Sequence, residues 1–112
     1  MCNIDIQSPE FVKCLEQGEQ EAFQRLFETF HKALCFFAAR IVRDHLEAED
    51  IVQDVFLSFW KMDRGGFPNL KTIKTFLYNS VQHRCLNYLR DLEIRDRNSR
   101  NLKREELDED YF

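Results

Sequence analysis

Apolar residues recur at three- and four-residue intervals along most of this chain, and that spacing is typical of amphipathic α-helices. The longest such run extends from Glu19 to Arg43 without a Gly or Pro. Its apolar stripe is expected to form core rather than to bind a cofactor, and it comprises Phe23, Leu26, Phe27, Phe30, Leu34, Phe37, Ala38 and Ile41. His31 stands alone beside this stripe, and we interpret it as a boundary or surface residue.

Two shorter runs predict helices on either side of the long one. The first is expected over residues 9–17, because Ser8 can cap it, a Pro fits its first position and Gly18 can end it. The other begins after Asp44, which can cap or end a helix, and it stops near Met62. The apolar face of this second run consists of Ile51, Val52, Val55, Phe56 and Phe59.

A fourth helix is expected after the loop over residues 63–69, which contains Gly-Gly and Pro. It begins between Leu70 and Lys74, and its periodicity lasts until about Arg95. The apolar positions that keep helical spacing are Ile73, Leu77, Val81, Cys85, Tyr88 and Leu92. Residues 97–112 are polar and charged, so we interpret them as the start of an interdomain linker or a disordered tail.

The four runs predict an all-α fold, a compact bundle of about four helices over residues 1–96. Scarce Gly and Pro, three and two residues, disfavour a turn-rich β-fold. The longest apolar stretch, 33–39, is far too short to cross a membrane, and no secretory signal is apparent. Four widely spaced cysteines form no C-x-x-C pair and indicate reduced thiols in a cytoplasmic protein, without a metal or cofactor.

Charge is segregated along the chain although the net charge is only −4. Residues 1–62 hold six Lys and Arg against eleven Asp and Glu, residues 63–104 hold ten against four, and residues 105–112 hold none against five. A basic block between acidic ones can attract phosphates whatever the net charge, although an ordinary solvated helix face has the same composition.

Catalytic patterns are lacking. His31, His45 and His83 fit no H-E-x-x-H motif, and Gly65-Gly66 is not followed by the G-K-[ST] of a phosphate-binding loop. The sequence therefore indicates a protein that binds partners rather than an enzyme.

The third predicted helix carries a second stripe, spaced i, i+3, i+4, i+7 and i+10, away from its apolar face. It comprises Asp50, Gln53, Asp54, Leu57 and Trp60. An acidic face that also offers Leu and Trp suits docking on a basic partner helix. On spacing alone, a solvated acidic face with one aromatic residue explains it equally well.

The fourth predicted helix combines hydrogen-bonding side chains, aromatic rings and positive charge. Such a surface suits contact with phosphates and the stacking of unpaired bases. The candidate DNA-binding residues are Lys71, Lys74, Phe76, Asn79, His83, Asn87 and Arg90. The alternative is a helix whose aromatic residues face the core.

Three motifs, in order over about residues 22–90, resemble extracytoplasmic-function (ECF) sigma factors. Residues 23–30 (FQRLFETF) are similar to the start of their region 2.1, and residues 49–60 (EDIVQDVFLSFW) to the D-(L/I)-(V/I)-Q-(E/D)-x-F-x-x-x-W pattern of region 2.2. Residues 76–90, from Phe-Leu-Tyr to Leu-Asn-Tyr-Leu-Arg, are similar to regions 2.3 and 2.4.

This resemblance implies a helical domain that binds core RNA polymerase and recognises and melts the promoter −10 element. It implies that Asp50, Gln53 and Asp54 face the β′ clamp helices. It also implies that the loop over residues 63–70 and the fourth helix hold the non-template strand of the −10 element.

Two positions depart from the family pattern. His83 stands where the family usually has Asn, and Asn79 where a basic residue is common, so no base preference is carried over.

In the family a second domain reads the −35 element, and nothing in this sequence matches it. An anti-sigma factor is a further expected partner. The alternative hypothesis is a helical protein-binding adaptor without sequence-specific DNA binding.

Overall fold

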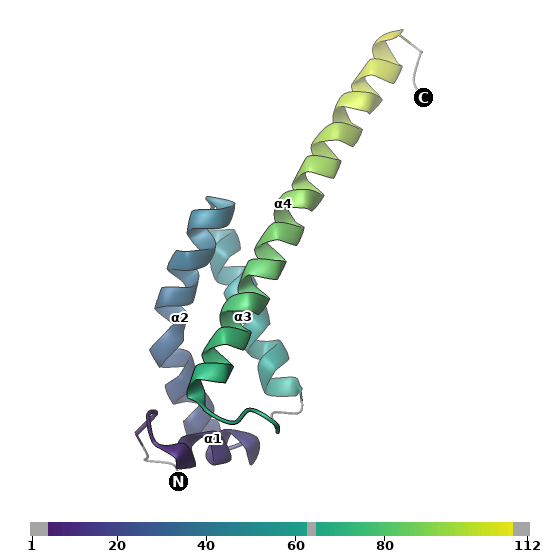
Figure 1. Cartoon of the computed structure of the whole chain (residues 1–112). Coiled ribbons are helices and arrows are strands. Elements are labelled where there is room, and N and C mark those ends of the chain that lie inside the picture. The colour runs from purple at the N-terminus through teal and green to yellow at the C-terminus, as the bar shows by residue number, and fades with distance from the viewer. Residues whose placement is uncertain (1–4, 63–64, 109–112) are drawn as a thin grey trace.

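Four α-helices follow one another in the computed structural model (Figure 1): α1 (Pro9–Glu16), α2 (Gln20–Val42), α3 (His45–Lys61) and α4 (Leu70–Asp108). The structure describes residues 5–62 and 65–108, with side chains up to residue 98. Helices α2, α3 and α4 pack against one another, and α1 packs against α2 at one end of the bundle. The predicted all-α bundle is confirmed, and all four helices begin within two residues of their expected starts.

Short polar side chains start three of these helices. The Ser8 hydroxyl accepts a hydrogen bond from the backbone N–H of Glu10 at 3.4 Å, and the Asp44 carboxylate accepts two, at 3.1 and 3.2 Å. Asn69 caps α4 by accepting from the backbone N–H of Thr72 at 2.9 Å. These bonds satisfy N–H groups that have no partner within the helix, which is why the sequence located the helix starts well.

The core lies where α2, α3 and α4 face one another. No polar or charged residue is buried among those that the structure describes. The buried side chains of the three helices are Ala22, Leu26, Phe30, Leu34, Ala38 and Val42; Ala48, Ile51, Val52, Val55, Phe56 and Phe59; and Ile73, Leu77, Val81 and Cys85. The predicted apolar face of α3 is thus confirmed in full.

The predicted core stripe of α2 was too wide. Phe23, Phe27, Phe37 and Ile41 are only half-buried, because they flank the line of closest approach to α3 and α4. Phe37 packs edge-on against Tyr78 of α4 with ring centroids 5.1 Å apart. Two of the remaining residues, Phe23 and Phe27, contribute to the surface described below.

Helix α4 runs well beyond its predicted end near Arg95 and reaches Asp108 (Figure 1). Leu92, expected to face the core, is 39% exposed, because α4 projects past the ends of the other helices. Residues 96–108 contain neither Gly nor Pro and are rich in Arg, Lys, Glu and Leu, which favour helix without a buried face. The last residues of the predicted tail, 109–112, lie outside the described residues.

Candidate functional site

The outer face of α3 presents the predicted acidic stripe to solvent. Asp50, Gln53 and Asp54 are all exposed, and the Leu57 side chain is 53% exposed. The opposite side of the same helix is buried in the core, so the stripe is held on a fixed support. Leu57 follows Asp54 along the stripe and lines a hollow with Phe23 and Phe27 of α2, and this grouping of apolar side chains at the surface favours a contact surface over a merely solvated face.

Trp60 extends this stripe towards α2. Its ring is half-buried and lies 4.6 Å, centroid to centroid, from the ring of Phe23. Phe27 packs beside them against Phe56, with centroids 4.9 Å apart. The rings from the two helices therefore form one aromatic patch.

Two adjoining hollows run over this patch between α2 and α3, and we call them together the α2–α3 groove. One is lined by Phe23, Phe27, Gln53, Phe56 and Leu57, and the other by Gln20, Phe23, Gln24, Phe27, Glu28 and Trp60. Sequence reasoning assigned Phe23 and Phe27 to the core and so missed their part in this surface. The available signal was their position at one edge of the α2 stripe, four residues apart.

The exposed side of α4 carries two shallow hollows that share Asn79. The α3-side hollow is lined by Phe76, Asn79, Ser80, His83 and Arg84. The α2-side hollow is lined by Lys71, Lys74, Thr75, Tyr78 and Asn79. Five of the seven predicted DNA-binding residues thus gather around Asn79, whereas Asn87 and Arg90 lie farther along the helix and line neither hollow.

Phe76 joins the α3-side hollow to the loop before α4. Its ring lies 5.4 Å from that of Phe67 and 6.1 Å from that of the buried Phe59, measured between centroids. Gly66 adopts a left-handed backbone with φ of 96°, which turns the chain just before Phe67. The loop is therefore anchored beside the hollow by aromatic packing; its residues Asp63 and Arg64 lie outside the described residues.

A hydrogen bond ties the α3-side hollow to α3. The Nη2 group of Arg84 donates to the Ser58 hydroxyl at 3.0 Å. Neither Ser58 nor Ser80 was singled out from the sequence, because the contact depends on how α3 and α4 pack.

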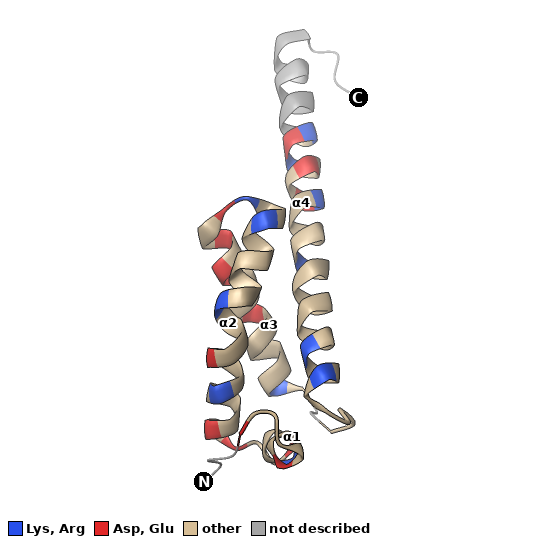
Figure 2. Ribbon diagram, turned by 60° about the vertical axis from the view of Figure 1, so that its left-hand side comes forward, with Lys and Arg blue, Asp and Glu red and all other residues tan. Residues whose placement is uncertain are grey.

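The charges of the two surfaces differ. Figure 2 shows acidic positions on α3, basic positions at the start of α4, and both kinds along α2. Lys71 and Lys74 on α4 are exposed, as are Asp50 and Asp54 on α3. One bundle thus offers a surface for a cationic partner and a surface for an anionic one.

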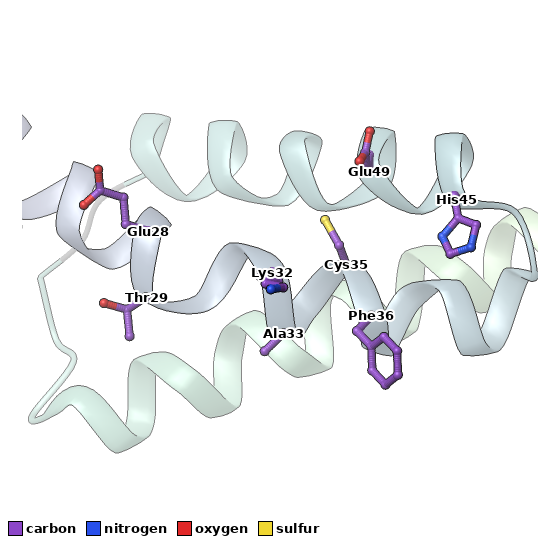
Figure 3. A pocket seen from close by; sticks show the side chains of 8 residues that line it. All are labelled: Glu28, Thr29, Lys32, Ala33, Cys35, Phe36, His45 and Glu49. Atoms are coloured by element: carbon purple, nitrogen blue, oxygen red, sulfur yellow. The ribbon is translucent and has the colours of Figure 1, made fainter.

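A further hollow lies on the outer side of α2, facing the start of α3 (Figure 3). The Cys35 thiol points towards α3, whereas Phe36 points away and is 69% exposed. Burial, with a smaller contribution from the Glu49 carboxylate, raises the pKa of the Cys35 thiol, so the thiol stays protonated at neutral pH. His31, half-buried, stacks on Phe27 and lies 3.5 Å from Cys35 Sγ through Nε2, which fits the expected boundary position.

The described residues contain neither a cluster that could hold a metal ion nor a helix that could span a membrane. Within residues 5–62 and 65–108, no three His, Cys, Asp or Glu side chains group in a way that could hold a metal ion. The described helices also include none long and apolar enough to cross a bilayer. Burial raises the pKa of the Cys85 thiol, which lies in the core.

Comparison with known proteins identifies the family. The sigma-70 region 2 family matches residues 26–94, more than half of the chain, and this segment contains every residue of the acidic stripe and of the two α4 hollows. Comparisons with curated proteins and with solved structures found no match. The chain therefore belongs to the sigma-70 region 2 family and is a sigma factor domain, with a role in binding RNA polymerase and recognising promoter DNA in transcription initiation.

Proposed function

We propose that this chain is an ECF-type sigma factor domain that docks on the β′ clamp helices of core RNA polymerase through α3 and holds the melted −10 element through α4. The observation that carries the proposal is the pair of exposed surfaces with opposite charge on two helices of one bundle, both within residues 26–94. Residues 1–96 form the binding unit in this proposal, and residues 97–112 begin a linker.

Docking rests on the acidic stripe and the α2–α3 groove together. Asp50 and Asp54 attract a basic helix and set its orientation, while Gln53 can hydrogen-bond within the contact. Leu57 and Trp60 supply the apolar centre that gives such contacts most of their affinity. The half-buried Phe23 and Phe27 rings widen that centre onto α2.

Promoter binding rests on the two α4 hollows. Lys71 and Lys74 contact phosphates of the non-template strand, which places the strand without reading its sequence. Asn79 and His83 hydrogen-bond to the edges of unpaired bases in the α3-side hollow, where Phe76 forms an apolar wall. Capture of unpaired bases offsets the few kcal/mol that unstacking costs, so binding stabilises the open strand.

The proposal includes regulation by an anti-sigma factor. A protein that covers the α2–α3 groove excludes polymerase from it, and its interface would be apolar at the centre with basic residues around it. The proposal also includes a cytoplasmic location, because core RNA polymerase and promoter DNA are found there.

The experiment compares strand preference with and without core polymerase. The chain is mixed with core polymerase, and binding of labelled single-stranded and duplex oligonucleotides of randomised sequence is measured by fluorescence anisotropy. The proposal expects the complex to bind single strands more tightly than duplex, and selected strands to share a sequence. A chain that binds polymerase but shows no strand preference at any salt concentration would instead be the protein-binding adaptor.

Docking is tested separately with Gln53→Ala, which removes one hydrogen-bonding group from the stripe. Its affinity for core polymerase should fall several-fold while the thermal unfolding curve stays unchanged. Gln82→Ala is the matched control, because Gln82 is exposed on α4 and lines neither hollow there.

A further inference from the structure

Arg84 reaches sideways from α4 to α3. Its Nη2 group donates to Ser58 Oγ at 3.0 Å, across 26 positions of sequence. The other side-chain hydrogen bonds found between described residues join positions within four of each other, as Gln24 and Glu28 do. The Arg84 side chain is therefore fixed by tertiary structure, unlike a freely moving surface arginine.

The fixed guanidinium lies at a wall of the α3-side hollow. Arg84 lines it beside Phe76, Asn79 and His83. Arg84 shares one stripe of α4 with Phe76 and Ser80, at four-residue spacing. Asn79 and His83, also four positions apart, form the neighbouring stripe, and both stripes line the hollow.

The charge of Arg84 has no carboxylate partner among the residues that the structure describes, where the ion pair found is Arg97 with Glu93 on the outer part of α4. A guanidinium has five N–H donors in a planar fork, and a single neutral hydroxyl uses one of them. The remaining donors suit an anionic oxygen, and a phosphate accepts such a fork through two parallel bonds.

We propose that Arg84, positioned by Ser58, binds a backbone phosphate of the unpaired strand whose bases enter the α3-side hollow. The inference rests on the proposed function and adds to it a strand path that leaves Asn79 and His83 towards α3. The path ends at Ser58, on the side of α3 that faces α4.

A purely structural role makes a different prediction. An exposed hydrogen bond that only joins α3 to α4 affects stability and leaves the salt dependence of strand binding unchanged. A phosphate contact releases counterions, so its loss lowers the salt slope of binding. The salt slope is therefore the deciding measurement.

The experiment measures binding of short single-stranded oligonucleotides of randomised sequence to the full chain on core polymerase, at several salt concentrations. For Arg84→Ala we expect affinity to fall about tenfold and the slope of log affinity against log salt to shrink by about 0.7, the value for one phosphate on a single strand. Arg84→Lys should keep the slope but bind about threefold more weakly, because a lysine cannot hold Ser58 and a phosphate in one plane.

Two further variants separate positioning from charge. Ser58→Ala keeps the guanidinium but frees it, so affinity should fall about twofold with an unchanged slope. Arg25→Ala, at an exposed arginine of α2 that lines no described hollow, is the control and should match the wild type.

An Arg84→Ala protein with a lower melting temperature but an unchanged salt slope would overturn the inference. Its failure is distinguishable from failure of the proposed function. If Asn79→Ala and His83→Ala weaken strand binding while Arg84→Ala does not, only the role of Arg84 is wrong. If the wild-type complex shows no preference for single strands, the proposed function itself is wrong.

Discussion

The outer faces of α3 and α4 are built on one core yet differ in almost every chemical property. On α3, Asp50 and Asp54 supply negative charge on the same stripe as the exposed Leu57. On α4, Lys71 and Lys74 supply positive charge near side chains that can donate to and accept from bases. The difference shows that the fold provides two rigid supports and the exposed positions assign a partner to each.

Because the two surfaces share one core, mutations in the core and mutations on a surface should have different effects. A change in the core should damage both surfaces together, whereas a change on one surface should leave the other intact. Helix α4 allows both kinds of mutation to be compared on one helix, because its inner side holds the core residue Leu77 and its outer side holds the exposed His83.

The largest expected effect is loss of both surfaces through the core. Leu77 is fully buried, and Leu77→Ala should lower the free energy of unfolding by about 3 kcal/mol through lost burial and the cavity left behind. Urea denaturation followed by circular dichroism measures this loss. Leu86→Ala is the control on the same helix, because Leu86 is 53% exposed and should cost about 0.5 kcal/mol or less. Equal losses for the two variants would contradict the packing of α4 described above.

Next in size is reversal of charge on α3. Asp50→Arg combined with Asp54→Arg places like charges against a basic partner, so affinity for core polymerase should fall about 100-fold, equivalent to about 3 kcal/mol. Both positions are exposed, so urea denaturation should show little change in stability. Glu16→Arg, at an exposed acidic position on α1, is the control. A fall of similar size for that control would mean that net charge, and not the stripe, governs docking.

A smaller effect is expected in the α3-side hollow. His83→Ala removes a side chain that can hydrogen-bond to a base edge, so single-strand binding by the polymerase complex should weaken about tenfold, at about 1–2 kcal/mol for one such contact. Binding to duplex should change less, because paired bases do not enter the hollow. His45→Ala, also exposed but at the start of α3, serves as the matched histidine control. Equal weakening on both kinds of DNA would remove His83 from base recognition.

Most of the fold could be predicted from the sequence because its signals are local. The cap at Asp44 and the apolar period of α3 depend on residues a few positions apart. The end of α4 was missed for a physical reason: the sequence of its outer part has no apolar period, yet its composition still favours helix.

In the candidate site, too, features within one helix could be predicted, whereas contacts between helices could not. The stripe on α3 could be read from spacing, since its members lie on one helix. Two contacts could not be predicted from spacing: the packing of Phe23 against Trp60 in the aromatic patch, and the hydrogen bond from Arg84 to Ser58. Each joins two helices that only tertiary packing brings together.

The smallest effect tests whether the positive charge of α4 acts separately from base recognition. Lys74→Ala should weaken binding of every single strand by about threefold, whatever its sequence, and should shrink the salt slope by about 0.7. The physical reason is that a phosphate contact carries charge but no sequence information.

Strand binding measured across a salt series gives the slope, and Lys32→Ala, at an exposed lysine of α2, is the matched control. Affinity for core polymerase should be unchanged in the Lys74→Ala protein, since Lys74 lies outside both the stripe and the α2–α3 groove. A loss confined to a few sequences would instead assign Lys74 to base reading. A loss of polymerase affinity would show that the two surfaces are not separate, because one positive charge on α4 would then contribute to docking as well.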